Sequence, residues 1–170
     1  MDIFVEQIVK KRFGAKDYAL SFLTVFGGLA ILFLCMAFFP QALFLALVGV
    51  CAGAYFVITS RNLEFEYSVT NGDLTIDRII NRRKRKRVIS LDLHNVEEMG
   101  KYSAEAHRAK NYAKRYVAAG TDDGQGGWYL SVRQPQTGSV LVVFDPEEKV
   151  LDAVKPFLPR QVSVSAFRGY

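Results

Sequence analysis

Charge is absent from one long stretch of this 170-residue sequence. No Asp, Glu, Lys, Arg or His lies between Ala19 and Ile58, so all 22 basic and 17 acidic residues lie outside that stretch. A single membrane span needs about 20 apolar residues, and this run is about twice as long as that. The sequence therefore predicts an integral membrane protein, with one segment in lipid and the remainder in water.

Residues that bind metals or carry out catalysis are also scarce. The two cysteines, Cys35 and Cys51, both fall inside the apolar run at different predicted depths, which disfavours a disulfide between them. The two histidines, His94 and His107, fall in different predicted elements, and each is predicted to be an ordinary surface or turn residue. There is no Gly-rich phosphate loop and no nucleophile elbow. The sequence therefore predicts no metal site, no cofactor and no enzymatic activity.

The apolar run is interrupted near its middle by Pro40. Proline removes a backbone donor and disfavours helix in the residue before it, so we expect two helices, over residues 18–39 and 41–59, within a membrane hairpin of residues 18–60. A cleaved signal peptide is not expected, because the first apolar core is too long and a second follows at once. No ionisable group lies within the run, which favours an anchor over a transport pathway.

Basic residues flank the hairpin on one side only. Lys10, Lys11, Arg12 and Lys16 precede it, a second group from Arg61 to Arg87 follows it, and the turn at Pro40 carries no charge. Loops rich in Lys and Arg stay in the cytoplasm. We therefore expect a two-span protein of the cell membrane with both termini cytoplasmic.

Small residues in the hairpin indicate close helix packing. Gly49 and Gly53 form a GxxxG step in the second helix, and Gly28 lies four residues after Thr24 in the first. Small side chains let helix backbones approach closely in lipid. Packing of the hairpin on itself is the preferred interpretation, and a homo-oligomer is the alternative.

The segment before the hairpin, residues 1–17, has an amphipathic pattern. Ile3, Phe4 and Ile8 fall on one side of a helix over residues 2–13, with Lys10 and Lys11 near its end. Such a helix would lie in the headgroup region of the bilayer.

Residues 61–160 are predicted to form a cytoplasmic domain of alternating strands. Asn71-Gly72 between two such runs is a strong two-residue hairpin signal. Asp145-Pro146 then begins an amphipathic helix, followed by a tail of residues 161–170. Residues 103–111 are predicted to form a short helix or an ordered insertion. About seven strands are expected, over residues 63–70, 73–80, 86–91, 96–99, 114–119, 127–133 and 139–144. The fold class is an α+β membrane protein with an antiparallel β-sandwich or small barrel closed by a C-terminal helix.

The hydrophobic pattern of this domain resembles a known family. Phe65-x-Tyr67-x-Val69-Thr70-x-Gly72-x-Leu74-x-Ile76, then Val88-x-x-Leu91-x-x-x-x-Val96, resembles the opening of bacterial pleckstrin-homology-like (PH-like) domains. The helix after Phe144-Asp145-Pro146 fits the same layout, and the whole chain is similar to short two-span membrane protein families of unknown function. The resemblance implies a binding or scaffolding module, and the lack of a catalytic constellation disfavours an enzyme.

The strongest polar feature is an unbroken basic run, which comprises Arg82, Arg83, Lys84, Arg85, Lys86 and Arg87. It is predicted to join the second and third strands of the domain. Anionic lipid headgroups are the first candidate partner. The alternatives are a protein partner and a charge run that only sets topology, whereas nucleic acid is disfavoured by the lack of interleaved aromatic residues.

Two functions follow from these features. The first is a membrane-anchored binding or scaffolding protein whose PH-like domain engages lipid headgroups or a protein. The alternative is an accessory subunit of a larger membrane complex that packs through the hairpin.

Overall fold

The chain folds as two compact units. The computed structural model describes residues 3–135 and 137–168. One unit is helical and comprises Phe13–Leu63, and the other is β-rich and combines the chain up to Arg12 with the chain from Glu64 onward. The helical unit is thus an insertion within the β-rich unit. This differs from the predicted arrangement, in which a domain of residues 61–160 simply followed the hairpin.

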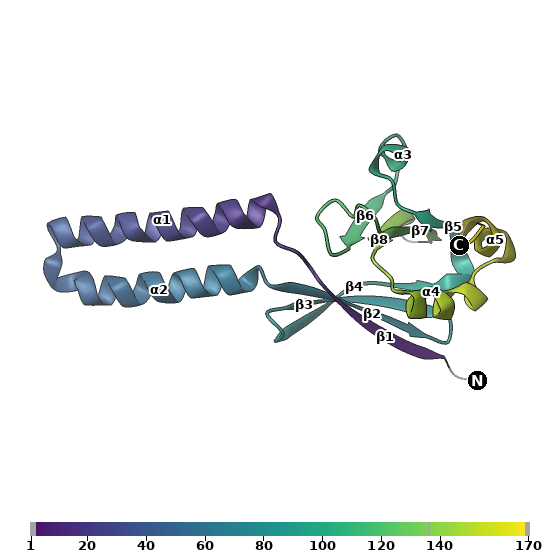
Figure 1. Cartoon of the computed structure of the whole chain (residues 1–170), viewed down its shortest axis with the longest axis horizontal. Coiled ribbons are helices and arrows are strands. Elements are labelled where there is room, and N and C mark those ends of the chain that lie inside the picture. Colours follow the sequence, from purple (N-terminus) through teal and green to yellow (C-terminus); the bar gives the residue numbers. More distant parts are fainter. Residues whose placement is uncertain (1–2, 136, 169–170) are drawn as a thin grey trace. The chain divides into compact units, whose positions relative to one another are not determined.

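Two long helices joined by a short turn make up the helical unit (Figure 1). Helix α1 spans Ala15–Phe38, the 3-10 turn η1 spans Pro40–Ala42, and helix α2 spans Leu43–Ser60. The break falls at Pro40, as the sequence predicted, because proline cannot continue the hydrogen-bonding of the helix before it.

The ends of the two helices that lie away from this turn are joined by Asp17. Its carboxylate accepts a hydrogen bond from the backbone N–H of Gly14 at 3.2 Å, next to the start of α1. The same carboxylate lies 4.0 Å from the guanidinium of Arg61, just after the end of α2. The first and last turns of the hairpin are therefore held by one acidic side chain.

The first sheet contains four strands in the order β1-β2-β3-β4. They are β1 (Phe4–Lys10), β2 (Leu63–Thr70), β3 (Asp73–Ile80) and β4 (Lys84–Asp92). Between β2 and β3, Asn71 and Gly72 both have positive φ, at 48° and 95°, which confirms the predicted two-residue turn.

Strand β1 corrects the prediction of an amphipathic helix over residues 2–13. The strand pairs antiparallel with β2, from Phe4 opposite Thr70 to Lys10 opposite Glu64. Val5, Gln7 and Val9 point inward, and the polar Gln7 in the middle hides the alternation. Phe4 and Ile8, whose spacing indicated a helix, lie exposed on the outer side of this edge strand.

The second sheet has the order β5-β7-β8-β6. Its strands are β5 (Val96–Lys101), β6 (Lys114–Ala118), β7 (Trp128–Gln134) and β8 (Gly138–Phe144). Strands β6 and β8 are parallel, which corrects the all-antiparallel expectation. The short helix α3 (Ala104–Arg108) lies between β5 and β6, where a short helix or ordered insertion was predicted.

Two helices follow the second sheet instead of one. Helix α4 spans Glu148–Val154, the 3-10 turn η3 spans Lys155–Phe157 around Pro156, and helix α5 spans Arg160–Ala166. The predicted tail of residues 161–170 is therefore largely helical, and its last two residues lie outside the described part of the chain. Pro156 and Pro159 limit α4 and separate it from α5.

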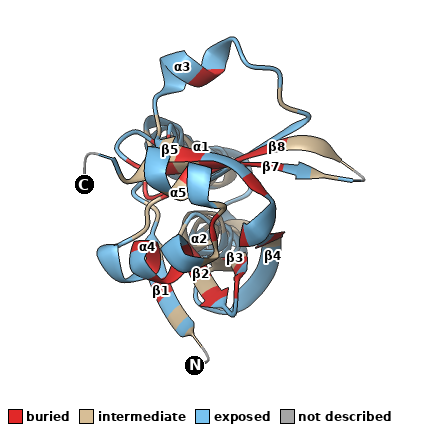
Figure 2. Ribbon diagram, turned by 90° about the vertical axis from the view of Figure 1, so that its right-hand side faces the viewer, coloured by how far each residue is buried: buried red, intermediate tan, exposed pale blue. Residues whose placement is uncertain are grey.

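The hydrophobic core of the β-rich unit joins residues of both sheets with α4 and α5, and the buried residues follow the strands and α4 (Figure 2). Tyr67 lies fully buried at its centre, where its hydroxyl donates to the carbonyl of Ala118 and accepts from the N–H of Asp145 at 3.1 Å. Gln7 donates to the carbonyl of Asp145 at 3.0 Å and accepts from the N–H of Glu147 at 2.8 Å. These bonds connect β1 to the start of α4 and make β1 part of the domain.

Candidate functional site: a basic strand on an acidic sheet face

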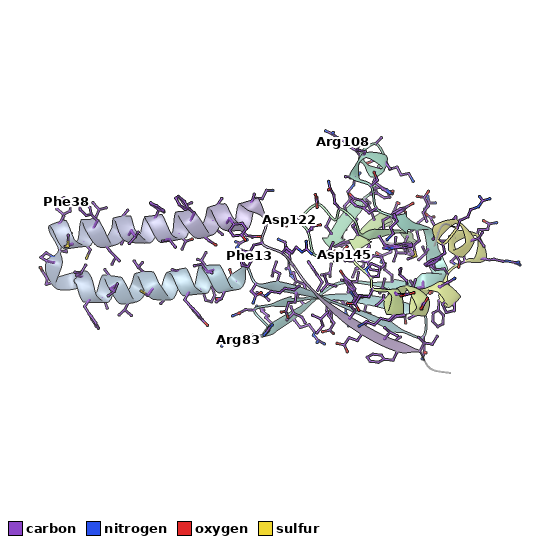
Figure 3. The ribbon with its side chains drawn as sticks, in the orientation of Figure 1. Phe13, Phe38, Arg83, Arg108, Asp122 and Asp145 are labelled. Atoms are coloured by element: carbon purple, nitrogen blue, oxygen red, sulfur yellow. The ribbon has the colours of Figure 1, made fainter. Side chains whose placement is uncertain are left out.

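The basic run lies partly in a turn and partly in a strand. Asn81 and Arg82 both have positive φ, at 50° and 53°, and form the turn between β3 and β4. Arg83 lies at the tip of this hairpin (Figure 3). The rest of the run, from Lys84 to Arg87, pairs with β3 as regular strand. The predicted third strand, over residues 86–91, therefore begins two residues earlier, at Lys84.

Three arginines of the run cover buried carboxylates. Arg82 pairs with Glu64 at 3.1 Å between Nε and Oε1, and Arg87 pairs with Asp77 at 3.3 Å between Nε and Oδ1. Arg85 pairs in the same way with Glu66. The acidic residues are only 5% to 8% exposed, whereas the arginine side chains are 58% to 74% exposed. The arginines thus form an outer cationic layer over a row of buried acids.

This row of acids is costly to bury. Burial raises the pKa of Glu66 above its usual 4.5, Arg85 opposes that rise, and the neighbouring Glu6 adds to it. A buried carboxylate is tolerated when it is paired and hydrogen-bonded. Arg82, Arg85 and Arg87 therefore stabilise the sheet, which makes them poor donors to an outside ligand.

The other three cations of the run have no such partner. Arg83, Lys84 and Lys86 make no ion pair among residues 3–135 and 137–168. All three are exposed to solvent. Six positive charges less three paired acids leave a surplus of three, and this surplus is carried by Arg83, Lys84 and Lys86.

The hairpin glycines divide into two groups. A Cβ added at Gly28 would lie 2.6 Å from Cγ1 of Val50, so Gly28 permits the contact between α1 and α2. A Cβ added at Gly49 or Gly53 would meet nothing within 4 Å. These two line an open groove of about 490 Å³ that also includes Gly27. The close contact at Gly28 fits the preferred interpretation of packing within the hairpin, whereas Gly49 and Gly53 line a groove formed by residues of both α1 and α2.

The two histidines differ from each other. His94 is 61% exposed and its ring bonds to Asp92, in agreement with the predicted turn residue. His107 is only 3% exposed, which corrects the prediction of a surface residue. Its Nδ1 lies 2.8 Å from the hydroxyl of Tyr112, and its ring lies against those of Tyr102 and Tyr129. Burial lowers the pKa of His107. Within the described residues, no three His, Cys, Asp or Glu side chains form a group that could hold a metal ion.

The sequence analysis missed Arg78, whose Nε is buried without a hydrogen-bond partner. The sequence alone does not mark Arg78 as a site residue, because its position beside the basic run depends on how β3 and β4 are paired. Arg78 lies directly opposite Lys86 in the β3–β4 pair, which brings a cation from outside the run next to a cation within it.

Both helices of the inserted unit are long and apolar enough to cross a membrane. Helix α2 contains no buried residue and α1 contains only Asp17 and Gly28. Large apolar side chains are correspondingly exposed, such as Phe38 at 71% and Phe44 at 78%. Contiguous apolar surface of this kind marks interaction with a membrane or a partner, so the helices fit a membrane anchor.

Comparison with known proteins identifies the family. A family model described as bacterial PH-like domain (DUF6106) matches residues 1–164. The match includes the hairpin and β1 as well as the two sheets. No curated protein and no solved structure gives a significant match. PH-like domains are generally non-catalytic binding modules, and this chain belongs to the bacterial PH-like domain family.

Proposed function

We propose that this PH-like protein is a non-enzymatic, membrane-anchored binding module that engages anionic lipid headgroups through Arg83, Lys84 and Lys86. The observation that carries the proposal is their surplus of three charges. Each basic residue near an anionic leaflet contributes about 1 kcal/mol, so three contribute at most about 3 kcal/mol. Binding of this strength would orient or restrain an anchored domain.

Chain connectivity supports a location near the bilayer. Arg82 is paired with Glu64, which follows Ser60, the last residue of α2, by only four positions. Because an extended chain spans at most about 3.6 Å per residue, this link is no longer than about 14 Å. The turn that carries Arg83 is therefore tied closely to a segment proposed to cross the membrane.

The same connectivity supports a cytoplasmic orientation. The hairpin leaves the β-rich unit after β1 and returns to it at β2, two strands that are paired along their length. Both ends of the hairpin must then lie on one side of the membrane. The concentration of Lys and Arg around these ends favours the cytoplasmic side.

Reporters fused at either terminus are expected to be active only as cytoplasmic reporters, and an extracytoplasmic signal from either would contradict the topology.

Amide hydrogen exchange tests the lipid proposal with the full chain in nanodiscs. Residues 81–87 are expected to exchange more slowly in nanodiscs that contain phosphatidylglycerol than in nanodiscs of phosphatidylcholine. The difference should shrink at high salt, because the Debye length falls from about 10 Å at 0.1 M to about 3 Å at 1 M. A charge-preserving variant with R83K, K84R and K86R is the matched control. Equal exchange in both nanodiscs at low salt would remove lipid headgroups and favour a protein ligand.

The groove lined by Gly27, Gly49 and Gly53 favours a second candidate function, that of an accessory subunit packed through its hairpin. Small residues that are not used within the hairpin leave room for another helix. In mild detergent this candidate predicts a stoichiometric partner chain or a second copy, lost when Gly49 and Gly53 are changed to Leu. A single protomer in wild type would exclude it.

A further inference from the structure

A small pocket opens between the two sheets of the β-rich unit. Its volume is about 270 Å³, and its lining residues come from β3, β4 and β6, namely Arg78, Lys86, Arg87, Val88 and Tyr116. Val88 lies at a register shift, since Ile76 pairs with Ile89 and the next residue, Asp77, pairs with Arg87. A bulge of this kind changes the direction of side chains. The lining combines three cationic residues with Val88 and Tyr116.

Two cations meet in this pocket without an acid. Arg78 and Lys86 are direct cross-strand partners, and like charges placed opposite each other destabilise a sheet. Neither forms an ion pair with any residue in the described ranges. Arg87 differs, because its Nε is already held by Asp77 at 3.3 Å. Two charges that no acid compensates therefore line this cavity.

The side chain of Arg78 also has an unsatisfied donor. Its Nε is buried and has no hydrogen-bond partner. A buried N–H without an acceptor is uncommon and calls for an explanation. An oxyanion in the pocket would supply both an acceptor for this N–H and a negative charge between Arg78 and Lys86.

We infer that this pocket binds a phosphate monoester. A phosphate monoester carries about two negative charges near neutral pH, which match two cations, whereas a carboxylate would match only one. Guanidinium groups bind phosphate oxygens with paired hydrogen bonds. Val88 and Tyr116 provide an apolar wall for the carbon atoms next to the phosphate, and the volume admits only a small group. Where the ester belongs to a lipid headgroup, the inference rests on the proposed function and gives it chemical specificity.

The test uses the full chain in nanodiscs of phosphatidylcholine, with sn-glycerol 3-phosphate as the titrant in calorimetry and glycerol as the blank. Wild type is expected to bind the phosphate ester and not glycerol. Arg78→Gln should weaken binding at least tenfold. Arg108→Gln removes the same charge from an exposed position on α3, outside the pocket and the basic run, and should change binding less than twofold. No binding by wild type, or equal weakening by both variants, would overturn the inference.

The source of the ester is distinguished by the nanodisc lipid. If the pocket takes a lipid phosphate, nanodiscs with phosphatidic acid will abolish binding of sn-glycerol 3-phosphate to wild type. If it takes only a free ester, phosphatidic acid will leave that binding unchanged. Either result identifies the source, provided that Arg78→Gln removes binding in phosphatidylcholine.

The unfolding temperatures of wild type and Arg78→Gln show whether Arg78 binds a ligand or only supports the fold. Without ligand, Arg78→Gln is expected to unfold at the same or a higher temperature, because it removes repulsion with Lys86. Saturating sn-glycerol 3-phosphate should raise the unfolding temperature of wild type and not that of Arg78→Gln. A lower unfolding temperature in ligand-free Arg78→Gln and in Lys86→Gln would assign these side chains to the fold and contradict the inference.

The two proposals can fail separately. If phosphatidylglycerol slows exchange of residues 81–87 but sn-glycerol 3-phosphate does not bind, the pocket is wrong and the proposed function stands. If sn-glycerol 3-phosphate binds through Arg78 but phosphatidylglycerol does not slow the exchange of residues 81–87, the electrostatic headgroup proposal is wrong and the phosphate pocket stands. The titration with phosphatidic acid then decides whether its ligand is a lipid phosphate or a free ester.

Discussion

The six cations of the basic run divide into two interleaved sets that have different surroundings. Arg82, Arg85 and Arg87 each cover a buried carboxylate of the sheet, whereas Arg83, Lys84 and Lys86 have no acid beside them within the described residues. The difference shows that a charge run cannot be treated as one site. Its paired members maintain the domain, and its unpaired members are available to a ligand.

The largest expected effect is on stability and comes from a paired arginine. Arg85→Gln leaves the carboxylate of Glu66 buried without its counter-ion, so the free energy of unfolding should fall by about 1–3 kcal/mol. Thermal unfolding of the full chain in neutral nanodiscs, followed by the circular dichroism of the sheets, measures this. Adding Glu66→Gln to Arg85→Gln should recover most of the loss. If Arg85→Gln is as stable as wild type, the pairing has no structural role.

The same pair should give a pH dependence that the unpaired cations lack. Because burial raises the pKa of Glu66 above 4.5, the folded state holds this proton to higher pH than the unfolded state does. The contribution of Glu66 to stability is therefore present at low pH and is lost as the pH rises through its folded pKa. Relative to Glu66→Gln, the stability of wild type should decline over that window, and Arg85→Gln should extend the decline to higher pH. Arg83→Gln should leave the profile unchanged, and a shift in that variant would contradict the division of the run.

The smallest expected effect on stability comes from the unpaired set. Replacing Arg83, Lys84 and Lys86 together by Gln should change the free energy of unfolding by less than about 0.5 kcal/mol, because exposed side chains without partners contribute little. Chemical or thermal unfolding in neutral nanodiscs checks this. A large loss would mean that these cations also support the sheet.

Local patterns in the sequence predicted the hairpin break at Pro40, the Asn71-Gly72 turn and the strands that alternate in hydrophobicity. They did not predict β1, because a buried polar residue, Gln7, interrupts its inward face and receives its partners from Asp145 and Glu147, far along the chain. The parallel pairing of β6 with β8 likewise joins residues that are distant in the sequence, so no local hydrophobic pattern predicts it.

The candidate site was predictable as a basic run but not as two sets. Glu64 and Glu66 occupy outward positions of an alternating strand, where exposed polar residues are the ordinary expectation. Their burial depends on arginines from β4 and from the turn before it, and that pairing depends on the register of β2, β3 and β4. The sequence contains the charges, whereas the fold decides which of them are neutralised.

Retention of acidic lipid by the purified protein tests the central claim most directly. Native mass spectrometry in mild detergent would count phosphatidylglycerol and phosphatidylcholine bound to three forms of the full chain: wild type, the variant with R83Q, K84Q and K86Q, and the charge-preserving variant with R83K, K84R and K86R. Wild type and the charge-preserving variant are predicted to retain phosphatidylglycerol in preference to phosphatidylcholine, and the Gln variant is predicted to lose that preference while keeping its fold. Equal preference for phosphatidylglycerol in all three forms would contradict the account.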